Sequence, residues 1–253
     1  MVWHAWGSRD SEPLLMLHGG GGSWTHWLRN VEAMAAAGYH VLVPDMPGFG
    51  ESAKPHGVSD ASSMPVPLEA GLTQIIGDQR CAVAAFSFGG IAAGQYINAH
   101  PGRVRHLVIA GTPLLGTTFN RLDLKPWRHS ASESERLEAH RHNLGSLMLH
   151  GPEARSEFAL ALHAENVERD RMFRRHQRTA DSQTVVSILQ GVSFPVDVIF
   201  GEEDNLYRGH LDTLRTALQT VPKFGSLWLV PGAGHWVQFE RAAEFNDLLK
   251  AAL

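Results

Sequence analysis

A serine lies between a short apolar run and a helix-like stretch, in a segment that favours a sharp turn. Residues 85–90 read AFSFGG, which is G-x-S-x-G with alanine in place of the first glycine. A tight strand-to-helix turn needs small residues around the serine, because larger side chains would clash there. The turn would lift the hydroxyl of Ser87 above the sheet, beside the N-terminus of the next helix. This pattern predicts Ser87 as a nucleophile; the alternative is that it only caps the helix.

A glycine cluster supplies what such a nucleophile needs. Residues 17–22 read LHGGGG and close the first strong apolar run. Glycines let backbone N–H groups turn inward and approach a ligand closely. We therefore predict an oxyanion hole made by the N–H groups of Gly20 and Phe88, with Gly21 as the alternative to Gly20. A phosphate-binding loop fits less well, because no dinucleotide-type or GK[ST] pattern accompanies the glycines. His18 is expected to be structural.

Two loops near the C-terminus provide an acid and a base. Residues 200–204 read FGEED and residues 231–236 read PGAGHW, each directly after an apolar run. A neutral imidazole can deprotonate a serine hydroxyl, and a buried carboxylate can orient that imidazole. We predict Ser87, Asp204 and His235 as a triad, in the chain order that a strand–turn–helix nucleophile requires. Glu202 and Glu203 are the alternatives for the acid; Asp204 is preferred because it lies further along the loop.

The elements that must position these residues are short apolar runs alternating with longer helix-like stretches. Such alternation predicts a doubly wound, mostly parallel sheet covered on both faces. An N-terminal edge strand over residues 2–6 is a further expectation. The apolar runs are 14–17, 39–43, 81–86, 104–110, 196–200 and 226–230, and the helix-like stretches are 27–37, 67–76, 88–99, 210–220 and 241–253.

One region, residues 114–189, carries no strand signal. Its segments 132–149 and 152–177 look like helices with polar faces. We predict a helical cap over residues 114–189, inserted into a core made of residues 1–113 and 190–253. A cap of this kind excludes water and shapes a pocket.

The composition sets the class of protein. The chain has 253 residues, 43% hydrophobic and 19% charged, with a formal net charge of −4, which is typical of a soluble globular protein. This balance gives no reason to expect nucleic acid or an anionic membrane as a partner. No apolar run is long enough to span a bilayer, and the first residues do not resemble a signal peptide. The single cysteine, Cys81, excludes an internal disulfide, so a cytoplasmic location is expected.

With these motifs in place, the chain resembles the α/β-hydrolase superfamily over nearly its full length. The matching stretches are LHGGGGSWTHW, VLVPDMPGFGESAKP, AFSFGG, IFGEEDNLY and GAGHWVQFE. The resemblance implies an α/β-hydrolase fold with an eight-stranded core, of which one edge strand could be absent here, and a helical cap. It also implies that Asp45, in PDMPGFG, lies on a structural turn.

Within that superfamily the chain is similar to hydrolases of meta-cleavage products, which cleave a carbon–carbon bond beside a ketone. The similarity is carried by GHWVQFERAAEFN, by the HGGGG stretch with Trp24 and Trp27, and by NLGSLMLHGPEA. The sequence departs from that branch at two positions. Phe86 precedes the nucleophile where an asparagine is common, and His163 takes the place of a cap arginine that binds the substrate carboxylate. Nearby arginines are alternatives for that role, although a solvated helix face explains them better: Arg169, Arg171, Arg174, Arg175 and Arg178.

These observations predict a serine hydrolase acting on a small carbonyl substrate, either a carboxylic ester or a carbon–carbon bond next to a ketone. The chemistry needs neither a metal nor an organic cofactor, and its partner is a small molecule; self-assembly is left open. Haloperoxidase-like, acyltransferase or lactonase activity on the same triad is an alternative, and a non-enzymatic ligand-binding member of the fold is another. The side chains expected to contact substrate are Trp236, His26, Phe86, His163 and Met148.

Overall fold

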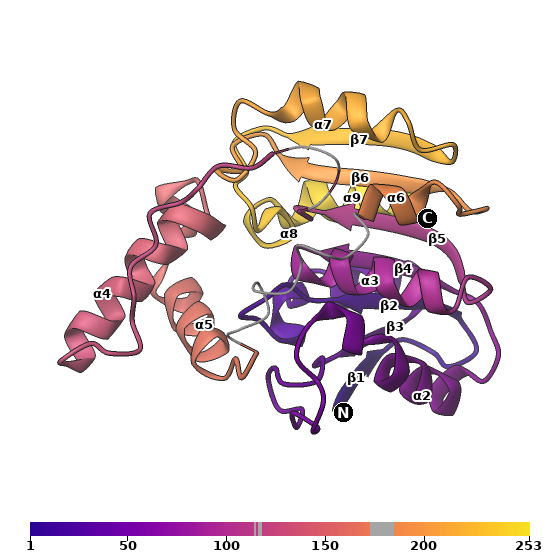
Figure 1. The fold of residues 1–253 in the computed structure, drawn as a ribbon, viewed down its shortest axis with the longest axis horizontal. Coiled ribbons are helices and arrows are strands. Elements are labelled where there is room, and N and C mark those ends of the chain that lie inside the picture. The colour runs from indigo at the N-terminus through magenta and orange to yellow at the C-terminus, as the bar shows by residue number, and fades with distance from the viewer. Residues whose placement is uncertain (114, 116–117, 173–184) are drawn as a thin grey trace.

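A single seven-stranded sheet forms the centre of the molecule (Figure 1). The computed structural model describes residues 1–113, 115, 118–172 and 185–253. The strand order is β1-β3-β2-β4-β5-β6-β7; β1 is antiparallel to β3 and all other neighbours are parallel. This confirms the predicted mostly parallel sheet with an N-terminal edge strand. The strands are β1 (Trp3–Trp6), β2 (Glu12–Leu17), β3 (Tyr39–Pro44), β4 (Cys81–Phe86), β5 (Val104–Ala110), β6 (Val196–Gly201) and β7 (Phe224–Val230).

Helices cover both faces of the sheet because alternate strand residues point to opposite sides. Leu15 and Leu17 of β2 belong to a core that includes residues of α2, α3, α6 and α7, whereas Leu14 and Met16 belong to a second core with α1 and α9. The helices are α1 (Val31–Ala36), α2 (Pro65–Ile76), α3 (Phe88–Ala99), α6 (Val185–Leu189), α7 (Leu211–Leu218), α8 (Val237–Glu240) and α9 (Ala242–Ala252).

The helix expected over residues 27–37 is divided in two. A 3-10 turn, η1 (Trp24–Trp27), begins early because the side chain of Ser23 accepts a hydrogen bond from the N–H of Thr25. Only then does α1 begin, at Val31. Asn30, which precedes α1, turns its amide toward α9 and the carbonyl of Gln238 instead of capping the helix.

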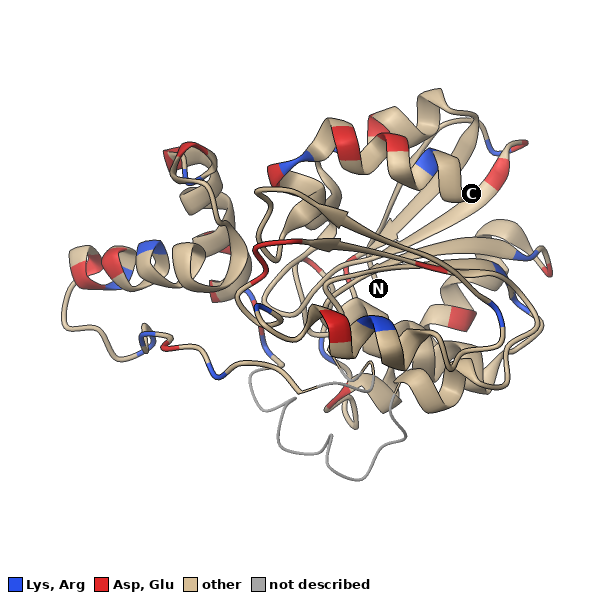
Figure 2. Ribbon diagram, turned by 90° about the horizontal axis from the view of Figure 1, so that it is seen from above, with Lys and Arg blue, Asp and Glu red and all other residues tan. Residues whose placement is uncertain are grey.

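The inserted region stands beyond the end of the sheet toward which β6 points (Figure 1). It contains α4 (Glu133–Asn143), a π-helical turn η3 (Leu144–Met148), a 3-10 turn η4 (Pro152–Ala154) and α5 (Glu157–Glu168). Charged residues of both signs lie along these helices (Figure 2), and the ion pairs Arg136–Glu168 and Arg141–Glu157 join α4 to α5.

The second helix of this region is shorter than predicted. It ends at Glu168 because Arg171 leaves the helix: its N–H donates to the carbonyl of Gly48, and its guanidinium donates to the carbonyls of Phe49 and Ser52. Residues 173–177 of the expected helix lie outside the described residues. Helix α6, at the end of the 114–189 range, packs against α3 of the core. Among the described helices, none combines the length and apolarity that a membrane crossing would need.

Close approach of α3 to the sheet generates a stability prediction. A methyl group on Gly89 would lie 2.4 Å from the carbonyl oxygen of Leu17 and 2.6 Å from that of His18, both backbone atoms. We expect Gly89→Ala to lower the free energy of unfolding by about 2–3 kcal/mol, as measured by urea denaturation. Gly102→Ala is the matched control, because a methyl group there meets nothing within 4 Å. Equal losses in the two variants would contradict the steric explanation.

Candidate active site

Ser87 sits on a strained turn between β4 and α3. Its φ is 51° and its ψ is −118°, and it is the only non-glycine residue with a positive φ in the part of the chain that the structure describes. Two contacts hold this conformation. The N–H of Ser87 donates to the carbonyl of Ala110 at 2.8 Å, and Gly90 packs so closely on Thr112 that a methyl group on Gly90 would collide with it. A left-handed serine that survives in such surroundings is typical of a functional turn.

Three side chains from separate loops form one hydrogen-bonded chain. Nε2 of His235 lies 3.0 Å from Oγ of Ser87, and Nδ1 of His235 lies 2.7 Å from Oδ2 of Asp204. An ionised carboxylate only accepts hydrogen bonds, so Nδ1 carries the proton and Nε2 is left to accept from the serine hydroxyl. The structure therefore brings together the three residues that the sequence singled out.

Asp204 is set apart from its acidic neighbours by burial. Its side chain is fully buried, and its second oxygen, Oδ1, accepts from the N–H of Leu206 at 2.9 Å. Glu202 is exposed, and Glu203 forms an ion pair with Arg208 at the surface. Neither glutamate takes part in the contacts of His235 that the structure records.

The glycine loop after β2 lies against the serine turn. A methyl group on Gly19 would be 3.2 Å from Cβ of Ser87 and 2.9 Å from the ring of Phe86. Gly20 and Phe88 both line the cavity that contains the Ser87 hydroxyl. Two buried imidazoles hold the loop: Nδ1 of His26 accepts from the N–H of Gly19 at 3.1 Å, and His18 bridges the carbonyl of Gly19 and the N–H of Met46. His18 therefore holds the loop through both of its ring nitrogens.

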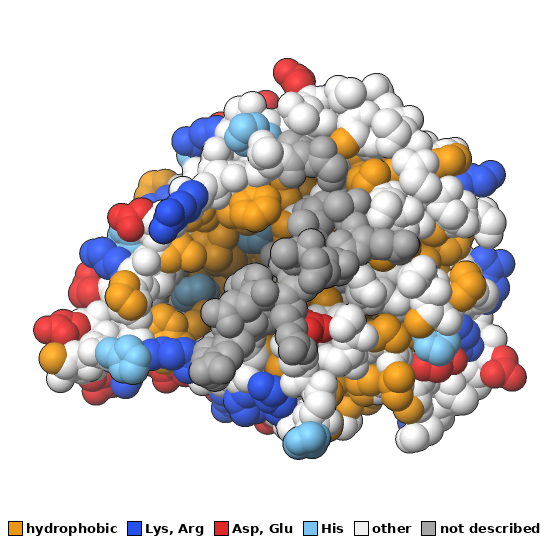
Figure 3. Space-filling view, in the orientation of Figure 1, with side chains coloured by type: hydrophobic (Ala, Val, Ile, Leu, Met, Phe, Trp, Pro, Cys, Tyr) orange, Lys and Arg blue, Asp and Glu red, His pale blue; other side chains and the backbone are white. Residues whose placement is uncertain are grey.

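A cavity of about 370 Å³ opens over the serine. Hydrophobic side chains gather in a hollow between the helices α4 and α5 and the sheet (Figure 3). A second cavity of about 240 Å³ adjoins the first and shares Gly20, Leu124, Leu147 and Met148 with it. The wall of the first is mostly apolar, with the side chains of Phe88, Ile91, Phe119, Leu122, Met148 and Leu206. The second is more polar, with Arg128, Asn143, His163 and Asp170.

Comparison with known proteins now assigns the family. The model of the alpha/beta hydrolase family matches residues 14–248. The chain belongs to the alpha/beta hydrolase family.

Relatives and solved structures agree with this assignment. A 2-hydroxy-6-oxononadienedioate/2-hydroxy-6-oxononatrienedioate hydrolase of Cupriavidus pinatubonensis is 28% identical over 254 residues, covering 94% of this chain and 86% of the relative. The 2-hydroxy-6-oxo-6-phenylhexa-2,4-dienoate hydrolase of a Rhodococcus species superposes with a TM-score of 0.80 at 22% identity, covering 99% and 93% of the two chains. An esterase of another Rhodococcus strain gives 0.76 at 22% identity, covering 98% and 92%. The chain is an α/β-fold hydrolase, similar to meta-cleavage-product hydrolases and to esterases.

Three of the five side chains predicted to contact substrate line these cavities in the α/β hydrolase. Phe86 and Met148 line the first cavity, and Met148 and His163 line the second. His163 is buried, and its ring meets that of His140 edge-on, with 5.9 Å between centroids. Burial, with a smaller contribution from His140, lowers the pKa of His163 to about 3. The imidazole of His163 is therefore neutral near pH 7.

The other two, His26 and Trp236, are placed differently from the prediction. Both are buried and line neither cavity. The indole N–H of Trp236 donates to the carbonyl of His26 at 2.9 Å, and its ring stacks on Phe239. Burial, followed by the positive charges of neighbouring histidines, lowers the pKa of His26 well below its usual value. These two residues support the glycine loop. The ring of His26 accepts a hydrogen bond from the N–H of Gly19, and the indole N–H of Trp236 in turn binds the backbone of His26.

The arginines near the end of α5 are occupied where the structure describes them. Arg169 pairs with Glu165 one helical turn earlier, at 2.7 Å, and Arg171 binds backbone carbonyls of the loop after β3. Arg174, Arg175 and Arg178 lie outside the described residues. Sequence reasoning missed Arg128, whose guanidinium lies 4.3 Å from the centroid of the Trp127 ring on the wall of the second cavity. Arg128 lies in a turn after an irregular segment without periodicity, so no pattern pointed to it.

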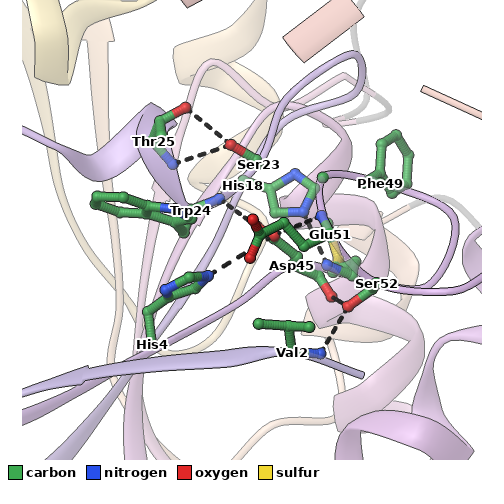
Figure 4. Close-up of polar contacts among 12 residues, drawn as sticks. Val2, His4, His18, Ser23, Trp24, Thr25, Asp45, Phe49, Glu51 and Ser52 are labelled. Atoms are coloured by element: carbon green, nitrogen blue, oxygen red, sulfur yellow. Dashed lines mark hydrogen bonds and ion pairs between the residues drawn. The ribbon is translucent and has the colours of Figure 1, made fainter. Parts of the chain in front are cut away.

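Among the described residues, one cluster of metal-ligating types is formed by His4, Asp45 and Glu51 (Figure 4). Asp45 is fully buried, and its two carboxylate oxygens accept from the N–H groups of Trp24 at 2.8 Å and Glu51 at 2.9 Å. Nε2 of His4 lies 3.7 Å from Oδ2 of Asp45. Since backbone donors already bind both oxygens, Asp45 organises the turn after β3.

The depressed pKa of His163 generates a prediction on pH and stability. The folded protein holds this group unprotonated down to about pH 3, whereas in the unfolded chain it gains a proton near pH 6.5. Stability from this group is therefore complete above pH 6.5 and is lost as the pH falls toward 3. When the pH falls from 7 to about 5.5, we expect the free energy of unfolding of the parent to drop by about 1 kcal/mol more than that of His163→Gln.

Urea denaturation at the two pH values measures this difference. His56→Gln is the control, because His56 is exposed and its substitution removes only a solvated imidazole. A parent-like pH slope in His163→Gln would show that the folded protein admits a proton at this position.

Proposed function

We propose that this chain is a serine hydrolase that cleaves a small carbonyl substrate through Ser87, His235 and Asp204. One observation carries the proposal: the imidazole of His235 lies 3.0 Å from the serine oxygen and 2.7 Å from a buried carboxylate oxygen. A serine hydroxyl is a weak nucleophile until a base removes its proton. Here the base and the group that orients it are already within hydrogen-bonding distance.

The reaction follows from the roles of these atoms. His235 takes the proton of Ser87 as Oγ forms a bond to the carbonyl carbon of the substrate. The N–H groups of Gly20 and Phe88, residues that line the cavity with Ser87, donate hydrogen bonds to the substrate oxygen as it becomes negatively charged. Asp204 stabilises the imidazolium, which then protonates the leaving group; a water molecule activated by His235 releases the acyl group. Each step uses side chains and backbone amides of this chain.

The cavities favour an ester with an apolar acyl or aryl group. Apolar side chains dominate the wall around Ser87, and Phe86 packs beside the ring of His235. In the adjoining cavity His163 is neutral at pH 7, so it can donate a hydrogen bond to a substrate oxygen but cannot pair with a carboxylate as a cap arginine would.

Cleavage of a carbon–carbon bond is the second candidate. The relative from Cupriavidus, which matches 94% of this chain, is named as a hydrolase of 2-hydroxy-6-oxononadienedioate and 2-hydroxy-6-oxononatrienedioate, and such a dienoate ketone is the substrate that this reaction needs. Arg128 lines the second cavity and supplies a cation that a dienoate carboxylate could meet. In this reaction the leaving group is a carbanion equivalent, so the pocket must first help the substrate to adopt its keto form.

Replacing the serine tests the reaction class. We expect Ser87→Ala to reduce hydrolysis of p-nitrophenyl esters by at least about 10⁴-fold and to abolish labelling by a fluorophosphonate probe, because no nucleophile remains. Ser134→Ala, at an exposed position of α4, is the matched control and should keep parent rates. Turnover undiminished in Ser87→Ala would eliminate the serine-hydrolase proposal.

A panel of substrates separates the two candidates. We expect short p-nitrophenyl esters with apolar acyl groups to be turned over faster than a lactone or a dienoate diketone, because the cavity at Ser87 is apolar. Rates are measured in parallel with purified parent protein and with Arg128→Gln. If the dienoate diketone is the fastest substrate, and loses activity in Arg128→Gln while the esters do not, carbon–carbon cleavage replaces ester hydrolysis as the assignment.

A further inference from the structure

The carboxylate of Glu240, at the end of α8, lies between the loop of His235 and the cap. Oε2 accepts from the N–H of Gly234 at 2.7 Å and from the N–H of His150 at 3.1 Å. Oε1 accepts from the N–H of Gly151 at 2.6 Å. Three backbone donors therefore converge on one half-buried side chain, and hydrogen bonds to an ionised acceptor are stronger than neutral ones. One carboxylate thus joins the residue before His235 to the cap.

The segment that Glu240 binds, residues 149–151, is also bound by Arg155. Arg155 donates from Nε to the carbonyl of Leu149 at 3.1 Å and from Nη2 to the carbonyl of His150 at 2.6 Å. The N–H groups of this short segment thus go to an anion, and its carbonyls go to a cation. The backbone just after Met148, which lines both cavities, is fixed by these two side chains.

The loop of His235 contacts this segment directly. The N–H of Trp236 donates to the carbonyl of Met148 at 2.8 Å. A methyl group on Gly234 would lie 2.8 Å from the nitrogen of His150 and 3.1 Å from the carbonyl oxygen of Met148, so the two backbones touch with no side chain between them. Since Gly234 and Trp236 are both tied to the cap, His235 lies between two fixed neighbours.

We propose that Glu240 is a positioning residue that holds His235 toward Ser87 and, through the same three hydrogen bonds, sets the place of Met148 in the cavity wall. The proposal rests on the proposed function, because it assigns to Glu240 the alignment of the base in that reaction. Glu240 contacts neither Ser87 nor Asp204 in the recorded interactions; it acts on His235 only through the backbone of Gly234. The base and the cap wall therefore share one support.

Glu240→Gln tests this role with the smallest change in shape. The amide retains one oxygen acceptor and places an NH₂ group against backbone N–H donors, so the three hydrogen bonds cannot all form. The control is Glu244→Gln, the same chemical change at an exposed position on α9. Active sites are counted by labelling to completion with a fluorophosphonate, so that kcat for p-nitrophenyl acetate refers to folded protein alone.

We expect kcat per labelled site to fall on the order of 10- to 100-fold in Glu240→Gln, the loss that a small misplacement of a catalytic group produces. KM for longer acyl esters should rise as well, because Met148 shifts, and Glu244→Gln should match the parent in both. A purely structural role would lower the melting temperature and leave kcat per labelled site unchanged. A value within about twofold of the parent in folded Glu240→Gln would overturn the proposal.

If Glu240→Gln does not fold, Glu240→Asp takes its place. It keeps the charge, but its shorter side chain cannot reach all three donors, so the same fall in kcat is expected and a parent-like kcat would overturn the proposal. A second readout needs no substrate: the low-field NMR signal of the Nδ1 proton between His235 and Asp204. We expect this signal to broaden in the Glu240 variant and to stay sharp in Glu244→Gln; a sharp signal in both would contradict the positioning role.

These measurements separate the two proposals. A parent protein that neither labels nor hydrolyses esters defeats the proposed function, and the NMR comparison then still decides the role of Glu240. A parent that labels at Ser87, with Glu240→Gln equal to it in kcat and in the NMR signal, defeats only the role of Glu240.

Discussion

Ser87 has a backbone conformation that an L-amino acid adopts only under constraint, and the arrangement of the site depends on that constraint being met. Its φ of 51° is held by the hydrogen bond to Ala110 and by the close packing of Gly89 on the end of β2. Such strain costs about 1–3 kcal/mol and persists only where the surroundings over-determine the chain. Here the surroundings are two neighbouring strands, so the sheet itself points the hydroxyl out of the turn.

Parallel strands bring their carboxyl ends to one edge, and the remaining groups of the site come from that edge. Gly20 follows β2, Asp204 follows β6 and His235 follows β7. Strands β5 and β6 lie between β4 and β7, so the imidazole must reach across their ends to meet the serine. Gly111, directly after β5, permits this: a methyl group there would lie 3.0 Å from the ring of His235. The strand order and the missing side chain of Gly111 together set the distance between the imidazole of His235 and the hydroxyl of Ser87.

Features with a local physical cause could be predicted from the sequence. The runs 81–86 and 104–110 match β4 and β5 because fully buried strands need continuous apolar residues, and the small residues around Ser87 announce the turn. Side-chain direction could not be predicted. Adjacency to His235 suggested that Trp236 lines the pocket, yet its indole turns behind the glycine loop to reach the carbonyl of His26. The segment containing Arg128 has no period, so its place on the cavity wall follows only from tertiary contacts.

The turn η3 is hydrogen-bonded to the loops of both Asp204 and His235. Asn205, next to Asp204, donates to the carbonyl of Ser146 in the cap at 2.9 Å, and Trp236, next to His235, donates to that of Met148 at 2.8 Å. The loops of Asp204 and of His235 therefore each bind the turn η3, whose residues Leu147 and Met148 line the cavity at Ser87. Residues that line the cavity are thus hydrogen-bonded to the direct neighbours of Asp204 and His235. A substitution that shifted the backbone of residues 146–151 would for this reason also move the neighbours of Asp204 and His235.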